Sequence, residues 1–259
     1  MSEACRPVTV VTGAARGGGR GIALSLAGRT GTVVLVGRST RAHPNRLLPG
    51  TLEQTRDQLV ALGTDAVCFP ADLARPDQRA ALCSFVTGEF GGCDVLVNNA
   101  AYNPIARFTE LTAGRWAAAV EVSLNAAVDL TRALLPGMLA RGAGRVVNIG
   151  SAAATTEFGT QLAYAVAKAG LERFTTGLAA ELAGTGVAVN CVRVDEALRS
   201  EALAAMIGDA AEPGSGASPE EFGAAVRWIA DQPPSFTGQV LTFGHLRDLG
   251  ALAPHEGVA

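Results

Sequence analysis

Tyr164 and Lys168 stand four residues apart in the segment LAYAVAKAG, and Ser151 precedes Tyr164 by thirteen residues. On a helix, residues four apart lie on one face, so the phenol and the ammonium would point the same way. A phenol titrates at about pH 10 in water, and a neighbouring cation that stabilises the phenolate makes proton exchange easier near neutrality. The pair could therefore deliver a proton to a carbonyl. The alternative is a surface pair whose long side chains only cover apolar area.

A glycine-dense turn lies near the start of the chain. Residues 8–27 read VTVVTGAARGGGRGIALSLA, a β-branched run followed by glycines and then a helical apolar pattern. Gly13, Gly17 and Gly19 would let the backbone approach a pyrophosphate, whose charge the N–H groups at a helix start can bind. The spacing G-x-x-x-G-x-G differs from the G-x-G-x-x-G fingerprint, and no Gly-Lys-Ser/Thr follows as in a P-loop. A glycine loop without a ligand is the alternative.

Several short motifs occur in a fixed order along the chain. They are TGAARGGG, then Asp72, then NNAA at 98–101, then Ser151, and then Tyr164-x-x-x-Lys168. In this order the chain resembles the short-chain dehydrogenase/reductase family, single-domain type, over residues 8–193. The resemblance implies an α/β doubly wound Rossmann fold, a nicotinamide dinucleotide, and hydride transfer between that cofactor and an alcohol or carbonyl.

The resemblance also implies a role for each catalytic candidate. Tyr164 would be the general acid in carbonyl reduction and the base in alcohol oxidation. Lys168 would stabilise the phenolate and hold the hydroxyls of the nicotinamide ribose. Ser151, directly after the β-rich run RVVNIG, would donate a hydrogen bond to the substrate oxygen and hold the carbonyl in place.

The family's fourth catalytic residue, an asparagine that holds a water for proton relay, falls on Ser123 when counted from Trp116. Asn125 lies two residues further, which is about 200° around a helix. Asn125 could take that place only if a local bulge re-aimed it. The proton relay is therefore the step that this sequence puts in doubt.

Two further departures lie near the end of the family pattern. Where the family has Pro-Gly against the nicotinamide, this chain has Val194 and Asp195. Asp195 would either stabilise a cationic nicotinamide or cap a helix over residues 196–207, and the cap is the favoured reading. His245 stands near the family's Gly-Gly pair, so it is either a pocket residue or a solvated histidine of the tail.

The choice of cofactor depends on the end of the second expected strand, where an acid would bind a ribose 2′-hydroxyl. The chain has Arg38 there and no carboxylate before Glu53, and Arg16 lies inside the glycine turn. Two guanidiniums can clamp a 2′-phosphate, which predicts NADP(H) in preference to NAD(H), unless both are solvated loop charges. The resemblance adds the remaining cofactor contacts: pyrophosphate at Gly13, Gly17 and Gly19, adenine at Asp72 and Leu73, adenosine at Asn99, and ribose at Lys168.

The composition excludes several other classes of protein. The net charge is −3 and the arginines are scattered, which argues against a nucleic-acid partner. No eighteen-residue apolar run or signal peptide is found, so we expect no membrane partner and a cytoplasmic location. The five cysteines form no CxxC and the three histidines lie far apart, which predicts neither a disulfide framework nor a metal site.

Runs of β-forming residues alternate with helix-length segments, which is typical of a seven-stranded parallel sheet flanked by helices. We expect a single domain over residues 1–259, with a tail from 245–259 and a loop at 211–219. The resemblance implies a homodimer or homotetramer built on the two longest helices. The expected strands lie at 8–11, 32–36, 66–69, 94–97, 145–149, 187–192 and 239–243, and the expected helices at 51–62, 76–90, 112–140 and 160–183.

The sequence thus predicts an NADP(H)-dependent ketoreductase or alcohol dehydrogenase. Substrate contacts are expected from residues 102–108, 152–158 and 195–210, whose apolar character favours an apolar or aromatic carbonyl compound. One alternative keeps the fold but performs a non-redox lyase, dehydratase or isomerase step. Another is a nucleotide-sensing protein without catalysis, and the retention of Ser151, Tyr164 and Lys168 argues against it.

Overall fold

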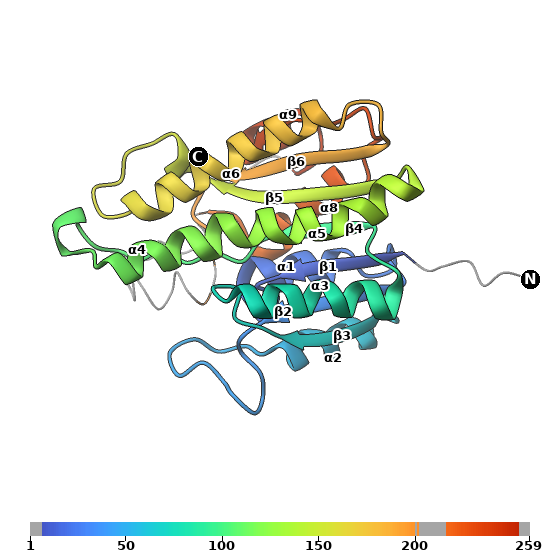
Figure 1. Cartoon of the computed structure of the whole chain (residues 1–259), viewed down its shortest axis with the longest axis horizontal. Coiled ribbons are helices and arrows are strands. Elements are labelled where there is room, and N and C mark those ends of the chain that lie inside the picture. Colours follow the sequence, from blue (N-terminus) through green and yellow to red (C-terminus); the bar gives the residue numbers. More distant parts are fainter. Residues whose placement is uncertain (1–6, 200, 202–215, 254–259) are drawn as a thin grey trace, which may run out of the picture.

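The computed structural model describes residues 7–199, 201 and 216–253 of the 259-residue chain (Figure 1). Seven strands form one parallel sheet in the order β3-β2-β1-β4-β5-β6-β7. All seven expected strands are present, and the predicted α/β doubly wound fold is confirmed. The strands are β1 (Val8–Thr12), β2 (Thr32–Gly37), β3 (Asp65–Pro70), β4 (Val95–Asn98), β5 (Gly144–Ser151), β6 (Val187–Val194) and β7 (Val240–Thr242).

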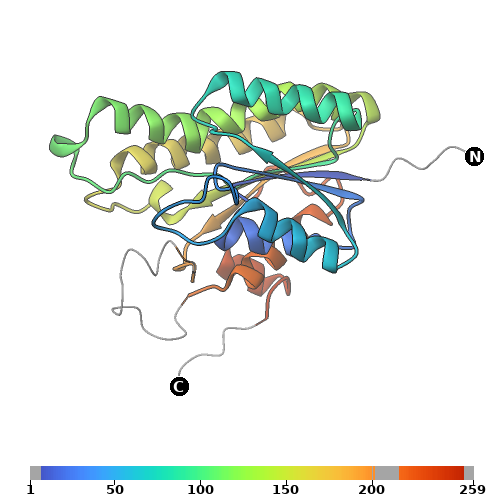
Figure 2. The same cartoon turned by 90° about the horizontal axis from the view of Figure 1, so that it is seen from below.

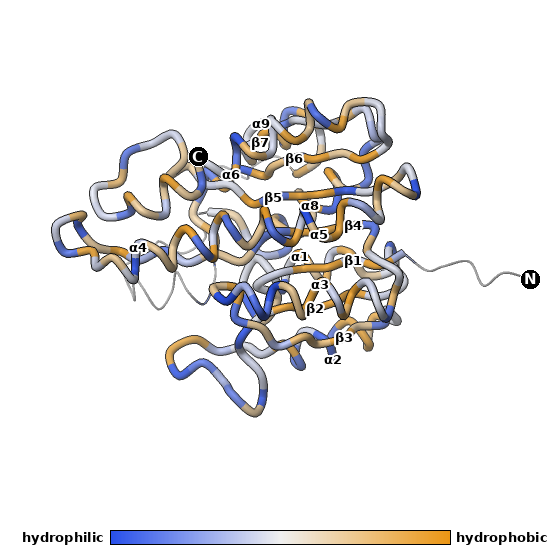
Figure 3. Tube along the Cα trace, viewed as in Figure 1, coloured by the Kyte–Doolittle hydropathy of each residue, from blue (hydrophilic) through white to orange (hydrophobic). Residues whose placement is uncertain are grey.

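Helices cover both faces of the sheet (Figure 2). One face carries α1 (Gly17–Ser25), α2 (Leu52–Ala61), α8 (Pro219–Ala230) and α9 (Phe243–Asp248). The other carries α3 (Pro76–Phe90), α4 (Ala113–Val120), α5 (Ala126–Arg141) and α6 (Leu162–Glu181). The inner strands β1 and β2 therefore read as nearly continuous apolar runs, because both of their faces are buried, whereas the edge strand β3 is only partly buried (Figure 3).

Successive residues of β2 show how the two halves of the core form. Val33 and Leu35 belong to the cluster on the α1 side, and Val34 and Val36 to the cluster on the α3 side. All four side chains are fully buried. Alternation of side chains across a strand thus supplies apolar area to both helical layers, worth about 1.5–3 kcal/mol for each fully buried valine or leucine.

Helices α1 and α8 pack closely through glycines. A Cβ built on Gly21 would lie 1.9 Å from the carbonyl oxygen of Pro219, and one on Gly223 would lie 2.4 Å from the oxygen of Gly21. Helix α8 was not expected from the sequence, although Ser218 and Glu221 form a capping box at its start. That S-x-x-E pattern, with Pro219 as the first helical residue, is a signal that could have found it.

The long helix expected over 112–140 is divided. A π-helical turn at Glu121–Asn125 lies between α4 and α5, so one extra residue is accommodated in this part of the helix. Strand β7 ends at Thr242, one residue before the expected end, because Phe243 begins α9. Residues 245–248, assigned to the tail, lie in that helix.

The predicted cap at Asp195 is wrong. Residues 195–199 have no helical structure, and the carboxylate Oδ1 of Asp195 accepts a hydrogen bond from the backbone N–H of Phe243 at 3.0 Å. Asp195 therefore binds the first turn of α9, where a negative charge is favourable. Residue 200 and residues 202–215, which include most of the expected helix, most of the expected loop and much of the expected substrate segment 195–210, lie outside the described residues. Within the described ranges, no helix has the length and apolar character needed to cross a membrane.

Candidate functional site

The predicted site residues gather at the carboxyl edge of the sheet. Gly13, Arg38, Asp72 and Asn99 follow β1, β2, β3 and β4, and Ser151 ends β5. Strand order reverses between β1 and β4, and ligands of open α/β sheets bind at such a switch point. The topology therefore brings together residues that lie up to 138 positions apart in the chain, from Gly13 to Ser151.

The glycine turn has the geometry of a backbone cradle. Gly13 and Gly17 have φ values of 70° and 50°, the left-handed region that other residues rarely adopt. A Cβ on Gly19 would lie 2.1 Å from the carbonyl oxygen of Gly13 and 2.7 Å from Nδ2 of Asn99. Helix α1 can start this close to β1 only because these positions lack side chains. The cradle thus fits a pyrophosphate bound through backbone N–H groups.

Thr12 joins the glycine turn to the segment after β4. Its Oγ1 accepts hydrogen bonds from the backbone N–H groups of Asn99 at 2.9 Å and Ala100 at 3.0 Å, and donates to the carbonyl of Val97 at 3.2 Å. The Asn99 side-chain amide donates to the Thr12 carbonyl at 2.7 Å. Because Thr12 is buried, these bonds fix the relative positions of the two loops that would surround the dinucleotide.

Arg16 extends from the glycine turn toward the loop after β2. Its Nε donates to the carbonyl of Pro49 at 2.7 Å, and its Nη2 donates to Ser39 Oγ at 2.6 Å and to the carbonyl of Gly50 at 2.9 Å. Burial lowers the pKa of Arg16; the charge of Glu201 opposes this shift, and the charge of the nearby, exposed Arg38 lowers the pKa further. The two guanidiniums are thus close enough to repel each other, and an anion between them would relieve that repulsion.

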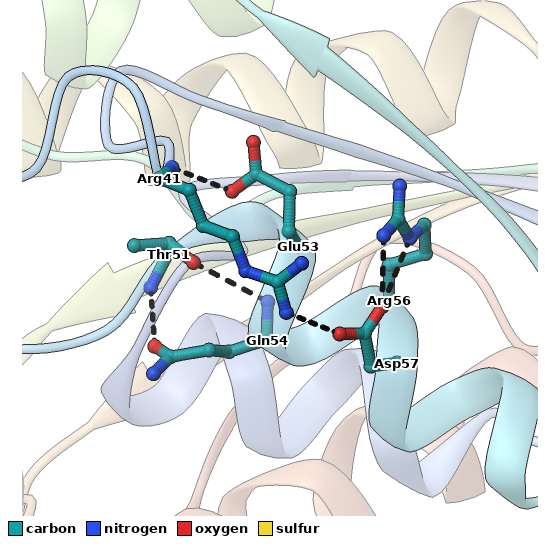
Figure 4. A network of polar contacts seen from close by, with 6 residues as sticks. All are labelled: Arg41, Thr51, Glu53, Gln54, Arg56 and Asp57. Carbon is teal, nitrogen blue, oxygen red and sulfur yellow. Dashed lines mark hydrogen bonds and ion pairs between the residues drawn. The ribbon is translucent and has the colours of Figure 1, made fainter.

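The loop that holds Arg16 is anchored at the start of α2 (Figure 4). Thr51 and Gln54 form a capping box, with bonds of 2.9 and 3.3 Å between each backbone N–H and the other side chain. Arg41 donates its backbone N–H to Glu53 at 2.9 Å and forms an ion pair with Asp57. These contacts fix residues 49–50, which accept hydrogen bonds from Arg16, so its guanidinium is held in one orientation.

Tyr164 and Lys168 lie on α6, four residues apart as predicted. Lys168 is 1% exposed and donates from Nζ to the carbonyl of Ile149 at 2.5 Å. Its ammonium lies 5.5 Å from the centre of the Tyr164 ring, and Tyr164 itself is half-buried. Buried lysines are rare unless their charge is used or compensated, so the placement of this cation beside the phenol is a specific feature.

Ser151 ends β5 and is half-buried. Its Oγ accepts a hydrogen bond from the backbone N–H of Ala153 at 3.2 Å, which begins the 3₁₀ turn Ala152–Ala154. The hydroxyl proton is not used in this contact, so Ser151 keeps a donor for a substrate oxygen.

Ser123 is buried within the π-helical turn. Its Oγ accepts from the backbone N–H of Tyr102 at 3.0 Å and donates to the carbonyl of the same residue at 3.3 Å. The side-chain amide of Asn125 donates to Glu121 Oε1 at 2.8 Å. The bulge that could have re-aimed Asn125 is therefore present, yet Asn125 binds Glu121 while Ser123 holds the loop that follows β4.

Arg79 is a site residue that sequence reasoning missed. It is 4% exposed, and its Nη1 donates to the carbonyl of Leu73 at 2.8 Å and to Glu121 at 2.9 Å, while Nη2 contacts Asp129 at 2.9 Å. Burial opposes ionisation of Glu121, but hydrogen bonds from Asn125 and Arg79 outweigh it and lower its pKa. Arg79 thus links the predicted adenine loop to the turn that carries Ser123. No local pattern in α3 distinguishes it from a surface arginine.

Asp72 is half-buried, and its Oδ1 accepts from the backbone N–H of Ala74 at 3.1 Å. This bond orders the loop before α3 and leaves the second carboxylate oxygen for a ligand. His245 is exposed and forms a capping box with Thr242 at the start of α9. It lies on the surface as a helix-capping residue.

Comparison with known proteins finds relatives that are named as dehydrogenases or reductases. The family model described as short chain dehydrogenase matches residues 7–196. The ketoacyl reductase HetN of Nostoc sp. is 37% identical over 192 residues, which cover 74% of this chain and 64% of HetN. The 3-oxoacyl-acyl-carrier-protein reductase FabG of Vibrio cholerae is 31% identical over 242 residues, or 90% of this chain and 94% of FabG.

Two solved structures extend the likeness to three dimensions. A metagenomic short-chain oxidoreductase in complex with NADP has a TM-score of 0.76 at 30% identity, covering 91% of this chain and 95% of its own. An actinorhodin polyketide ketoreductase with NADPH has a TM-score of 0.80 at 28% identity, and the match covers 92% of this chain and 95% of the ketoreductase chain.

Proposed function

Because this chain belongs to the short-chain dehydrogenase/reductase family of NAD(P)-dependent oxidoreductases, we propose that it reduces a carbonyl compound with NADPH, with Tyr164 as the general acid. The observation that carries the proposal is the buried ammonium of Lys168, 5.5 Å from the centre of the Tyr164 ring. When bound, the nicotinamide supplies or accepts the hydride. Tyr164 gives its phenolic proton to the substrate oxygen, and it takes that proton back when an alcohol is oxidised.

The positive charge of Lys168 stabilises the phenolate that remains after proton transfer. Its Nζ donates to the Ile149 carbonyl, which holds the side chain at the end of β5, and its other two N–H groups are available to ribose hydroxyls. Ser151 donates its hydroxyl proton to the substrate oxygen and so orients the carbonyl toward Tyr164. Ser123 orders the loop at Tyr102 through two backbone contacts rather than reaching the substrate.

The dinucleotide would lie across the switch point between β1 and β4. Gly13, Gly17 and Gly19 would form the cradle for the pyrophosphate, because a side chain on Gly13 or Gly19 would collide with Asn99. Asp72 and Leu73 would bind the adenine, and Asn99 would line the adenosine side.

Preference for NADP(H) is part of the proposal. Arg16 donates through Nε and Nη2 to the loop after β2. Among the residues that the structure describes, its Nη1 group makes no hydrogen bond, so this group would bind a phosphate together with the exposed Arg38. Both solved structures compared above hold the phosphorylated cofactor, which supports this choice. The names of the reductases HetN and FabG favour 3-oxoacyl compounds as the first substrates to screen.

The same proposal includes a single domain and a homodimer or homotetramer. Both helices carry exposed apolar side chains that a second copy could cover, Leu139 near the end of α5 and Leu162 and Val166 at the start of α6. Light scattering of the purified protein would measure the mass directly.

The test of the proposed chemistry is the variant Tyr164→Phe. It removes only the phenolic oxygen, so we expect turnover in the NADPH-linked assay to fall by about 10²–10⁴, the usual contribution of a positioned acid. NADPH affinity, measured in parallel by fluorescence, should change little because the ring and Lys168 remain. If the variant reduces a carbonyl substrate as fast as the wild type does, Tyr164 is not part of the mechanism. Product formation without loss of nicotinamide absorbance would instead indicate a non-redox reaction.

A further inference from the structure

The carboxylate of Glu201 lies at the N-terminus of α1. Its Oε2 accepts a hydrogen bond from the backbone N–H of Gly17 at 2.9 Å, and its Oε1 accepts from Arg20 at 2.6 Å. Gly17 is the first residue of α1 and the second glycine of the cradle. An anionic side chain from a distant part of the chain thus binds the N–H group assigned to the cofactor pyrophosphate.

The first turn of a helix binds a negatively charged group favourably for two reasons: its N–H groups have no partner within the helix, and the helix dipole is positive there. Helix α1 has no acidic residue in its own first turn, and the side chain of its N-cap residue Arg16 makes no capping bond. Glu201 therefore supplies the negative charge and the hydrogen-bond acceptor that α1 lacks in its own first turn. A pyrophosphate would supply the same charge and would accept from the same N–H group of Gly17.

The chain before Glu201 is held by the segment that precedes α8 and by α1. Residues Leu198 and Ala217 form a parallel β-bridge, with Arg199 donating to the Ala217 carbonyl and Ala217 donating to the Ala197 carbonyl, each at 2.9 Å. A Cβ on Gly18 would lie 2.9 Å from Cδ2 of Leu198, so this strand-like segment contacts α1 directly. Glu201 is only two residues beyond this anchor, which explains why its carboxylate reaches the start of α1.

We infer that Glu201 sets the affinity for the dinucleotide by competing with its pyrophosphate for Gly17 and Arg20. This inference rests on the proposed function, because it takes the cradle to be the pyrophosphate site. Two like charges cannot share one backbone donor, so the carboxylate leaves the helix start whenever the cofactor binds. Its departure also frees the guanidinium of Arg20, which can then pair with a phosphate oxygen. Cofactor affinity is therefore lower than the cradle alone would give.

The test measures the Kd of NADPH by fluorescence titration for the full chain and three variants. Glu201→Gln keeps the shape of the side chain without its charge, and Glu201→Ala removes the competing group. Both should bind NADPH about tenfold more tightly, since each loses a charged hydrogen bond that only the free protein makes, and the partial exposure of Glu201 limits the gain. Glu220→Gln is the matched control, because exposed Glu220 on neighbouring α8 loses the same charge and should leave Kd unchanged.

Equal Kd values for the wild type and both Glu201 variants would overturn the inference, and so would weaker binding by Glu201→Gln. An equal gain in Glu220→Gln would also overturn it, because net charge would then explain the effect. If no protein binds NADPH, the proposed function fails, and inorganic pyrophosphate becomes the probe of the inference. Calorimetry must then show tighter pyrophosphate binding in Glu201→Gln than in the wild type, and equal binding would overturn the inference independently.

Discussion

The variant Gly19→Ala tests whether the close approach of α1 to β1 creates the cofactor cradle. The added Cβ would lie 2.1 Å from the carbonyl oxygen of Gly13, whereas ordinary contacts begin at 3.4 Å, a shortfall of 1.3 Å. The obstructing atom belongs to the backbone, so no side-chain rotation relieves the collision. The start of α1 must move away from β1 by a comparable distance.

Two opposing free energies decide the effect of Gly19→Ala on stability. Alanine favours a helix over glycine by about 1 kcal/mol, and overpacking costs about 1–3 kcal/mol. We therefore expect the free energy of unfolding to fall by up to about 2 kcal/mol. Loss of even one charged hydrogen bond to the pyrophosphate, worth about 1.5–3 kcal/mol, would weaken NADPH binding roughly 10- to 100-fold.

The assay combines urea unfolding with NADPH fluorescence titration, and Gly88→Ala is the control. Gly88 is exposed on α3, and a Cβ there meets nothing within 4 Å. That control should gain about 0.5–1 kcal/mol of stability and bind NADPH as the wild type does. If Gly19→Ala retained wild-type NADPH affinity, the cradle would not depend on the contact between Gly19 and Gly13, and the assignment of the pyrophosphate site would be refuted.

Three further outcomes are expected. Arg38→Ala should raise the Kd of NADPH about tenfold and leave NADH binding unchanged, whereas Arg46→Ala, which changes an exposed arginine of the same loop, should alter neither; equal losses for both cofactors would refute the clamp. Glu121→Gln should lower the free energy of unfolding by about 1–2 kcal/mol near neutrality. Because the folded pKa of Glu121 lies below the usual 4.5, this difference should disappear as urea titrations move below that pH, and persistence in acid would contradict it. Burial raises the pKa of the described thiols, to about 12 for Cys191, so Ellman's reagent applied to Cys5→Ser at pH about 8 should modify half-buried Cys68 first, and rapid reaction of Cys191 would contradict this order.

Most of the fold could be predicted because its signals are local. The β-branched runs predicted seven strands, and a helix-length pattern predicted α3 with the bounds that the structure has, Pro76–Phe90. Helix α8 was missed although its capping box is equally local. The predicted cap at Asp195 failed because a carboxylate can accept from any N–H group within reach, and this one accepts from Phe243, 48 residues later. Sequence spacing carries no information about such a partner.

The sequence by itself determined the residue types of the candidate site and their order, since Tyr164 and Lys168 share a helix face at spacing i,i+4 and the glycines adjoin one helix start. Tertiary structure decided what each group contacts. The π-helical turn left Ser123 bound to Tyr102, the buried Arg79 joined two loops, and Glu201 reached the start of α1. The physical reason is that periodicity fixes only which face a side chain occupies. Partners brought together by the packing of distant segments depend on the whole fold.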